Sequence, residues 1–175
     1  NILKKRCKAK LALDATASIG LEKDHYYADT LGYSSCKGLF GLTGGAFVAF
    51  NNYPNNKINQ FNLNIFNHLE KKMTGPYHTI CSLNDVLKNY NDFKYAVISN
   101  KKFFLKKMEH YLTHKINEQP NLCTLIDKKI TKKDNKTILY QSRADITGSV
   151  ICHLGEVHLK RKAKGNIINS IKVIE

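Results

Sequence analysis

The apolar positions of this chain fall into short runs separated by polar and glycine-containing segments. Runs of adjacent apolar residues bounded by such segments are typical of buried strands. The run "KYAVISN" at 94–100 is the clearest of them, and it predicts a central strand. The same reasoning predicts further strands at 11–14, 46–50, 121–126, 137–142, 146–154 and 168–175.

Other stretches have the spacing of amphipathic helices. Apolar residues recur at three- and four-residue intervals from Phe61 to Leu69, and Gly75-Pro76 is expected to stop that helix. Residues 21–33 read as helical, and 82–90 as a short helix with Ser82 as its N-cap. The segment after the predicted central strand places five apolar residues on one helical face, namely Phe104, Leu105, Met108, Tyr111 and Leu112.

The predicted order of elements favours an α/β fold. The strand at 94–100, a short polar turn and the helix after it form half of a β-α-β unit. A change of character near residue 90 divides the chain into 1–90 and 91–175. Both ends of the chain read as interior sequence, because it starts at Asn1 and stops inside a strand-like run. We therefore expect a piece of a longer polypeptide.

The charge of the chain points to a polyanionic partner. Lys and Arg number 28 against 14 Asp and Glu, so the formal net charge is +14. Such an excess favours DNA or RNA as the partner. A coding sequence rich in A and T would also yield many Lys, Asn and Ile residues without any such partner.

The cysteines and the hydropathy bear on the compartment. The five cysteines are widely spaced and form no C-x-x-C motif, which argues for reduced thiols and against a disulfide scaffold or a zinc ribbon. No stretch has the length and apolarity of a membrane span, and no secretory signal is visible. We therefore expect an intracellular, cytoplasmic protein with no membrane partner.

Three motifs in order carry a family resemblance. The strand "LALDAT" ends in Asp14-Ala15-Thr16, "YAVISNKK" leads into a helix, and His153-Leu154-Gly155 is followed by Lys164-Gly165-Asn166. Together they resemble superfamily two helicases of viral and plasmid replicative type. The chain departs from that family at Lys164, where an Arg is usual, and in the long loop between Gly155 and Gly165.

The resemblance implies a fold and a set of roles. It implies the end of a first motor lobe in 1–90 and most of a second, RecA-like lobe with a largely parallel sheet in 91–175. Asp14 and Thr16 would couple nucleotide state to strand movement. A phosphate-binding loop and the residues for ATP and Mg²⁺ would lie in a missing upstream lobe. Six residues would contact the backbone of a nucleic acid, single-stranded in this reading: Lys160, Arg161, Lys162, Lys164, Gly165 and Asn166.

Two other classes of function remain open. Asp145, Glu156 and Lys160 resemble in outline the acidic residues and lysine of metal-dependent nucleases, although the lysine comes two residues too late. A basic module without catalysis could bind nucleic acid instead, with four aromatic residues stacking on bases: Tyr26, Tyr27, Phe103 and Phe104.

The histidines are explained by ordinary structural roles. His110 and His114 lie four residues apart and could share a helix face toward zinc, but a surface pair among lysines explains them better. His153, on an apolar strand, is predicted to be a core residue with its hydrogen bonds satisfied.

Overall fold

The computed structural model describes residues 2–53, 58–71, 75–139, 147–156 and 163–174. It divides into two compact units. Unit 1 holds residues 1–19 and 23–87, and unit 2 holds 20–22 and 88–175. The described residues combine helices with small mixed sheets, so the coarse α/β expectation holds.

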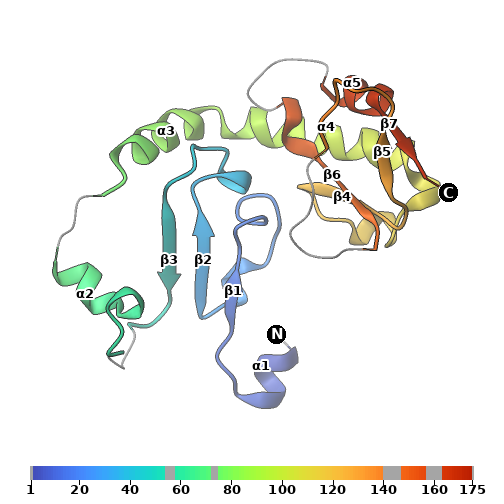
Figure 1. Cartoon of the computed structure of the whole chain (residues 1–175). Coiled ribbons are helices and arrows are strands. Elements are labelled where there is room, and N and C mark those ends of the chain that lie inside the picture. The colour runs from blue at the N-terminus through green and yellow to red at the C-terminus, as the bar shows by residue number, and fades with distance from the viewer. Residues whose placement is uncertain (1, 54–57, 72–74, 140–146, 157–162, 175) are drawn as a thin grey trace. The chain divides into compact units, whose positions relative to one another are not determined.

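Unit 1 is built on a three-stranded sheet in the order β1-β2-β3 (Figure 1). β1 (Ala12–Asp14) pairs in parallel with β2 (Thr30–Ser34), which pairs antiparallel with β3 (Ala46–Phe50). Helices α1 (Ile2–Cys7), α2 (Ile65–Glu70) and α3 (Tyr77–Lys88) complete the unit, apart from the last residue of α3. The strands predicted at 11–14 and 46–50 are therefore confirmed.

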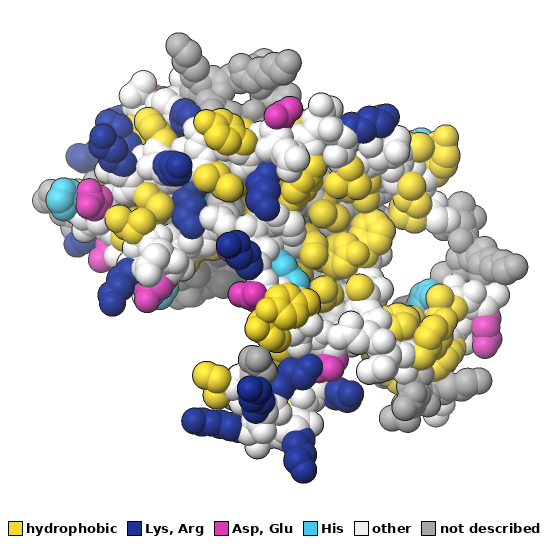
Figure 2. Space-filling model, turned by 180° about the vertical axis from the view of Figure 1, so that it is seen from behind, with side chains coloured by type: hydrophobic (Ala, Val, Ile, Leu, Met, Phe, Trp, Pro, Cys, Tyr) yellow, Lys and Arg dark blue, Asp and Glu magenta, His cyan; other side chains and the backbone are white. Residues whose placement is uncertain are grey.

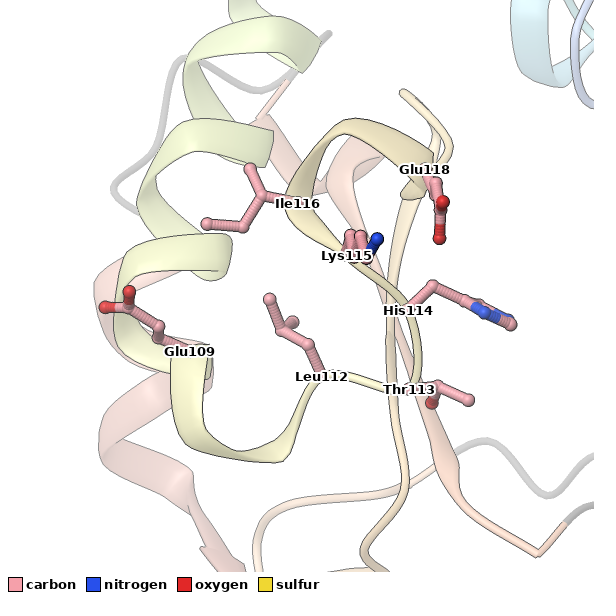
Figure 3. Close-up of a pocket in the computed structure, with 7 residues that line it drawn as sticks. All are labelled: Glu109, Leu112, Thr113, His114, Lys115, Ile116 and Glu118. Atoms are coloured by element: carbon pink, nitrogen blue, oxygen red, sulfur yellow. The ribbon is translucent and has the colours of Figure 1, made fainter.

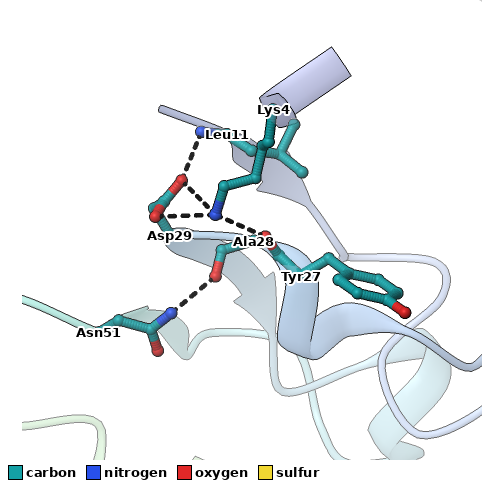
Figure 4. Close-up of polar contacts among 6 residues, drawn as sticks. All are labelled: Lys4, Leu11, Tyr27, Ala28, Asp29 and Asn51. Atoms are coloured by element: carbon teal, nitrogen blue, oxygen red, sulfur yellow. Dashed lines mark hydrogen bonds and ion pairs between the residues drawn. The ribbon is translucent and has the colours of Figure 1, made fainter. Parts of the chain in front are cut away.

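A polar clip built on Asp29 ties α1 to the start of β2 (Figure 4). The Asp29 carboxylate accepts the Leu11 N–H at 2.8 Å and pairs with Lys4 Nζ at 3.0 Å. Lys4 also donates to the carbonyl of Tyr27, and Asn51 Nδ2 donates to that of Ala28 at 3.0 Å. The Leu11 N–H and Lys4 lower the pKa of the Asp29 carboxyl. The clip sets the register in which the chain enters β2.

Two predictions for unit 1 are wrong in detail. Residues 21–33 do not form the expected long helix: they hold only a 3-10 turn at His25–Tyr27, and from Thr30 the chain pairs with both neighbouring strands, which outweighs local helical spacing. Helix α3 begins at Tyr77, so Ser82 lies inside it and is not an N-cap. The Ser82 hydroxyl accepts the Leu42 N–H at 3.2 Å instead.

Unit 2 packs two helices against two antiparallel strand pairs. α4 (Tyr90–Lys107) and α5 (Ala163–Ser170) contact each other, β4 (Cys123–Ile126) pairs with β6 (Ser149–Cys152), and β5 (Ile130–Lys132) pairs with β7 (Ile171–Val173). The core lies between them and consists of Phe104, Met108, Ile126, Ile151 and Ile171. The largely parallel sheet expected for 91–175 is wrong for the described strands, all of which pair antiparallel in this unit.

The predicted central strand at 94–100 is also wrong, because these residues lie inside α4. The buried residues of this helix are Val97, Asn100, Phe104 and Leu105, which recur with helical spacing. Tyr95 is 75% exposed, as a residue on the outer face of such a helix would be. A short apolar run does not distinguish a buried strand from a buried helix segment, and here the continuation of the pattern beyond Asn100 decides.

The end of the chain differs from expectation in a similar way. Ile167 and Ile168 belong to α5 and pack against the core, so the strand expected at 168–175 shrinks to β7. The strands at 121–126 and 146–154 are confirmed as the shorter β4 and β6. Residues 137–139 are not in a strand, and 140–142 lie outside the described residues.

Candidate nucleic-acid interface

The residues predicted to bind the nucleic-acid backbone are only partly described. Lys160, Arg161 and Lys162 lie outside the described residues, whereas Lys164, Gly165 and Asn166 form part of the first turns of α5. Gly165 is an ordinary helical residue with no atom within 4 Å of an added Cβ, so no close backbone approach there requires a glycine. Among the three described residues of this set, Lys164 contacts α4, which carries other lysines.

Lys164 lies over an aromatic ring of α4. Its Nζ is 5.7 Å from the centre of the Phe103 ring, within the range of a cation–π contact. Lys106 and Lys107 follow Phe103 by three and four residues, which places them beside it on the helix surface. Lys102 lies one turn before Lys106. We call these four residues, Lys102, Lys106, Lys107 and Lys164, the α4 basic cluster.

Three lysines of the α4 basic cluster carry unbalanced charge. Lys102, Lys106 and Lys107 are exposed, and none has a carboxylate within ion-pairing distance in the part of the chain that the structure describes. Figure 2 shows dark blue Lys and Arg side chains spread over the face of unit 2 that is turned toward the viewer. Lys106 and Lys107 also stand in the last turn of α4, where positive charge stabilises a helix. The cluster therefore has both a structural role and a surface potential attractive to phosphates.

An exposed tyrosine shares one stripe of α4 with Lys102 and Lys106. Tyr95 precedes Lys102 by seven residues and Lys106 by eleven, so the three lie within a narrow angular range of the helix. At a rise of about 1.5 Å per residue, Tyr95 and Lys102 are about 10 Å apart along the axis. Sequence reasoning missed Tyr95, because it assigned this residue to a buried strand.

Of the aromatic residues predicted to stack on bases, some are buried in the core and others lie at the surface. Phe104 is buried and stacks on His153 with ring centres 5.7 Å apart, so its role is packing. Phe103 is half-buried beneath Lys164. Tyr26 is 70% exposed and stands against Tyr27 in unit 1.

His153 is a buried core residue with satisfied hydrogen bonds, as predicted. Its Nδ1 is 2.7 Å from the carbonyl of Asn121, and its Nε2 is 2.8 Å from the Thr124 hydroxyl. A carbonyl only accepts, so Nδ1 carries the hydrogen and the hydroxyl donates to Nε2. Burial lowers the pKa of His153, which keeps the ring neutral.

The polar side chains around His153 also form hydrogen bonds. Asn100 Nδ2 donates to the carbonyl of His153 at 2.7 Å. Asn121 receives Lys101 Nζ on its side-chain oxygen at 3.0 Å and donates its own N–H to Glu22 at 2.6 Å. This network connects residues 20–22 to α4 and to the segment before β4.

Asp14 and Thr16 lie together at the end of β1 in unit 1. The Asp14 carboxylate accepts the Thr16 N–H at 2.9 Å, an interaction that closes a local turn. The Thr16 hydroxyl and N–H hold the pKa of the Asp14 carboxyl below its usual value. Ala15 between them is buried and donates to the carbonyl of Gly32 at 2.8 Å. These contacts account for the Asp-Ala-Thr sequence as a strand ending.

The glycines that follow in unit 1 serve packing. A Cβ at Gly38 would lie 2.2 Å from the carbonyl oxygen of Ile19, and one at Gly41 2.8 Å from that of Ser35. The Ser35 hydroxyl accepts the Gly45 N–H and donates to Leu42 O. The run from Gly38 to Gly45 is thus a packed turn.

A second basic surface lies at the start of unit 1. Exposed basic side chains extend through and past α1, and Figure 2 shows dark blue atoms gathered over this helix. They are Lys5, Arg6, Lys8 and Lys10. Lys4 differs from them because the Asp29 clip holds it. The run "KKRCKAK" was the sequence signal for this surface, and the prediction passed over it.

A hollow of about 540 Å³ in unit 2 does not have the features of a catalytic site (Figure 3). Leu112 and Ile116 face its interior, whereas Glu109 lies on the opposite side of the hollow from His114 and Glu118 (Figure 3). The polar groups therefore do not converge on one point where a substrate atom could react.

The zinc and nuclease alternatives gain no support from the geometry. His110 lies in a short 3-10 helix, Glu109–Tyr111, that does not extend to His114, so the two histidines share no helix face. The described residues contain no group of three or more His, Cys, Asp or Glu side chains that could hold a metal ion. Asp145 and Lys160 of the nuclease pattern lie outside the described residues.

Comparison of the sequence with protein-family models and with curated proteins gives no match. None of the helices that the structure describes is both long and apolar enough to cross a bilayer. The proposed function therefore rests on the surface chemistry of the two units.

Proposed function

We propose that unit 2 binds the sugar–phosphate backbone of single-stranded nucleic acid through the α4 basic cluster. The observation that carries this proposal is the set of three exposed lysines, Lys102, Lys106 and Lys107, with no carboxylate within ion-pairing distance among the described residues. Lysine side chains neutralise phosphates without reading bases, so the binding is independent of sequence.

Tyr95 favours a single strand over a duplex. Its exposed ring lies on the same stripe of α4 as Lys102 and Lys106 and offers a flat surface on which an unpaired base can stack. A base in a duplex is already stacked on its neighbours and is not available to it. DNA and RNA both carry the phosphates and bases that this arrangement would hold.

The helicase assignment stays a prediction from the resemblance. Its first motif, Asp14-Ala15-Thr16, closes a turn in unit 1, and its second, at 94–100, forms a helix. No contact among the described residues favours a motor role for Asp14 and Thr16 over that turn. Roles for ATP and Mg²⁺ would depend on residues outside this chain.

The test compares two triple substitutions that remove the same charge. We expect K102Q/K106Q/K107Q to weaken binding to a single-stranded oligonucleotide, measured by fluorescence anisotropy across a salt series. The slope of log K against log salt is expected to fall by about 0.7 for each lost phosphate contact, or about 2 in all. K5Q/R6Q/K8Q, which neutralises the α1 surface, is the matched control and is expected to retain most of the slope.

Equal loss in both variants would contradict a localised site, because it would mean that affinity follows net charge alone. Tyr95→Ala then separates strand types. We expect it to weaken single-strand binding by about 1 kcal/mol or more and to leave duplex binding unchanged. An equal effect on single strands and duplexes would argue against base stacking on Tyr95.

A further inference from the structure

Two cysteines distant in the sequence are direct partners across the β4–β6 pair. Cys123 is the first residue of β4 and Cys152 the last of β6, and the antiparallel register places them opposite each other. Residues opposite each other in adjacent strands project their side chains from the same face of a sheet. Their thiols are therefore neighbours, although 28 residues separate them in the chain.

The backbone hydrogen bonds next to Cys123 and Cys152 show whether this cross-strand pair is hydrogen-bonded or non-hydrogen-bonded. The His153 N–H donates to the carbonyl of Leu122 at 2.9 Å, one position beyond the pair on each strand. Cys123 and Cys152 thus form a non-hydrogen-bonded pair, for which the Cα atoms are about 4.5 Å apart. Disulfides span Cα separations of about 4.4–6.8 Å, so the backbone can accept a bridge without moving far.

The thiols lie on the open face of this strand pair. Thr124, Ile126 and Ile151 point to the buried face, whereas Cys123 is half-buried and Cys152 is exposed. A small solute can reach the exposed Cys152 directly, whereas the half-buried Cys123 beside it is less accessible. All five cysteines of the chain are free thiols in this structure.

We propose that Cys123 and Cys152 form a dithiol site that a small-molecule disulfide of the glutathione type oxidises reversibly to a cross-strand disulfide. This inference is independent of the proposed nucleic-acid binding.

The reaction proceeds by two exchanges. The Cys152 thiolate attacks one sulfur of the reagent, breaks its S–S bond and releases one thiolate, which leaves a mixed disulfide on Cys152. Cys123 then loses its proton to solvent, attacks the Cys152 sulfur and displaces the second thiolate. The two cysteines lose two electrons and two protons, and the reagent gains both as two thiols.

The surroundings of the two cysteines set this order. Burial is the main cause that raises the pKa of the Cys123 thiol to about 11; the neighbouring Cys152 and Glu22 add to this rise, and Lys101 acts against it. Little Cys123 is a thiolate at neutral pH, so exposed Cys152 reacts first and closure of the bridge is the slower step.

The bridge would close a loop that contains residues 124–151 and would hold β4 to β6 next to buried His153. A cross-link of this length stabilises a fold chiefly by restricting the unfolded chain. An exposed disulfide is also open to attack by thiols, which makes it reversible. The expected consequence is a unit 2 that is more stable under oxidising conditions and returns to its ordinary stability when reduced.

The experiment exposes the purified chain to mixtures of reduced and oxidised glutathione at pH 8. Acid quenching, alkylation and peptide mass analysis then follow. We expect the peptides that contain Cys123 and Cys152 to be cross-linked as one pair. The mass of this pair is expected to be two hydrogens below the sum of the two separate peptides. Cys7 and Cys81 are also exposed, and they serve as internal references for thiols that lie outside the strand pair.

The melting temperature is expected to rise by about 5 °C or more on oxidation. Cys123→Ser is expected to trap one glutathione on Cys152, since the second exchange is blocked.

The control variant moves the thiol of β6 by two residues on the same face of the strand pair. C152S/V150C places a cysteine at half-exposed Val150, which is diagonal to Cys123 and about 7–8 Å away, too far for a bridge. We expect no cross-link in this variant. One glutathione on each of Cys123 and Cys152 in the unsubstituted chain, without a bridge, would overturn the proposal. Equal cross-linking in the chain and in C152S/V150C would also overturn it.

Discussion

At the scale of single residues, the glycines separate into those that packing requires and those that it does not. A Cβ at Gly148 would lie 1.9 Å from the carbonyl oxygen of Ile126, whereas one at Gly165 would meet nothing within 4 Å. Sequence reasoning treated Gly165 as the functional glycine and passed over Gly148. The structure reverses their importance, because the space around a Cβ depends on neighbours distant in the sequence.

This contrast makes a paired prediction. Gly165→Ala is expected to raise the free energy of unfolding by about 0.5–1 kcal/mol, since alanine loses less backbone entropy in a helix. Gly148→Ala is expected to lower it by about 1–3 kcal/mol, because β4 and β6 must separate to admit the methyl group. Urea unfolding followed by circular dichroism measures both. Destabilisation by Gly165→Ala would mean that this glycine adopts a conformation other than the helical one described.

At the scale of elements, α4 and the β4–β6 pair are held together by the polar network around His153. The ring stacks on Phe104 from α4 and hydrogen-bonds Thr124 of β4, so a single side chain contacts both elements. The network works only with a neutral ring, because a protonated Nε2 could no longer accept from the Thr124 hydroxyl.

The stability of unit 2 is therefore expected to depend on pH. Burial lowers the folded-state pKa of His153 below its usual 6.5, and nearby Lys101 lowers it as well. Below pH 6.5 the unfolded chain binds a proton that the folded chain does not, so the free energy of unfolding falls as the pH falls. Above that pH both states are neutral and the effect vanishes.

Urea unfolding at pH 7.5 and 5.5 tests this dependence. His153→Gln is expected to be less stable at pH 7.5 but to lose less stability on acidification. His110→Gln, at an exposed position, is the control and is expected to keep the full dependence. A His153→Gln variant with the original pH dependence would show that other groups cause it.

At the scale of the whole molecule, the structure consists of two compact units with different basic surfaces. The division falls between Leu87 and Lys88, with residues 20–22 joined to unit 2, while the sequence suggested a boundary between 90 and 91. Unit 1 presents the α1 surface and unit 2 the α4 basic cluster. The hollow beside Leu112 and Ile116 in unit 2 brings no set of catalytic side chains together, and the described residues contain no group of three or more His, Cys, Asp or Glu that could hold a metal ion.

The purified 175-residue chain is accordingly expected to bind single strands without nucleotide and not to hydrolyse ATP. Its sequence contains no G-x-x-x-x-G-K-[ST] loop, and the glycines from Gly38 to Gly45 are used in packing. The measurement is phosphate release with Mg²⁺ and ATP, with and without a single-stranded oligonucleotide. Release stimulated by the oligonucleotide would contradict this expectation and would favour the motor assignment.

The sequence alone determined the features that depend on local pattern. The strands that became β1, β3, β4 and β6 were recognisable from short apolar runs, and Phe104 and Met108 were recognisable as core residues from helical spacing. His153 was predicted as a satisfied core residue because it lies in an apolar stretch. The excess of basic charge was likewise apparent from composition, although its distribution over the surface was not.

The tertiary structure decided what depends on contacts between distant segments. The apolar run at 94–100 is compatible with a buried strand and with a buried helix segment. It forms part of α4 because the buried residues of this helix pack against the core with helical spacing. Residues 30–34 form β2 because β1 and β3 supply hydrogen-bonding partners on both sides. The pairing of Cys123 with Cys152 and the exposure of Tyr95 follow from such contacts. Local preferences amount to fractions of a kcal/mol per residue, and tertiary packing readily outweighs them.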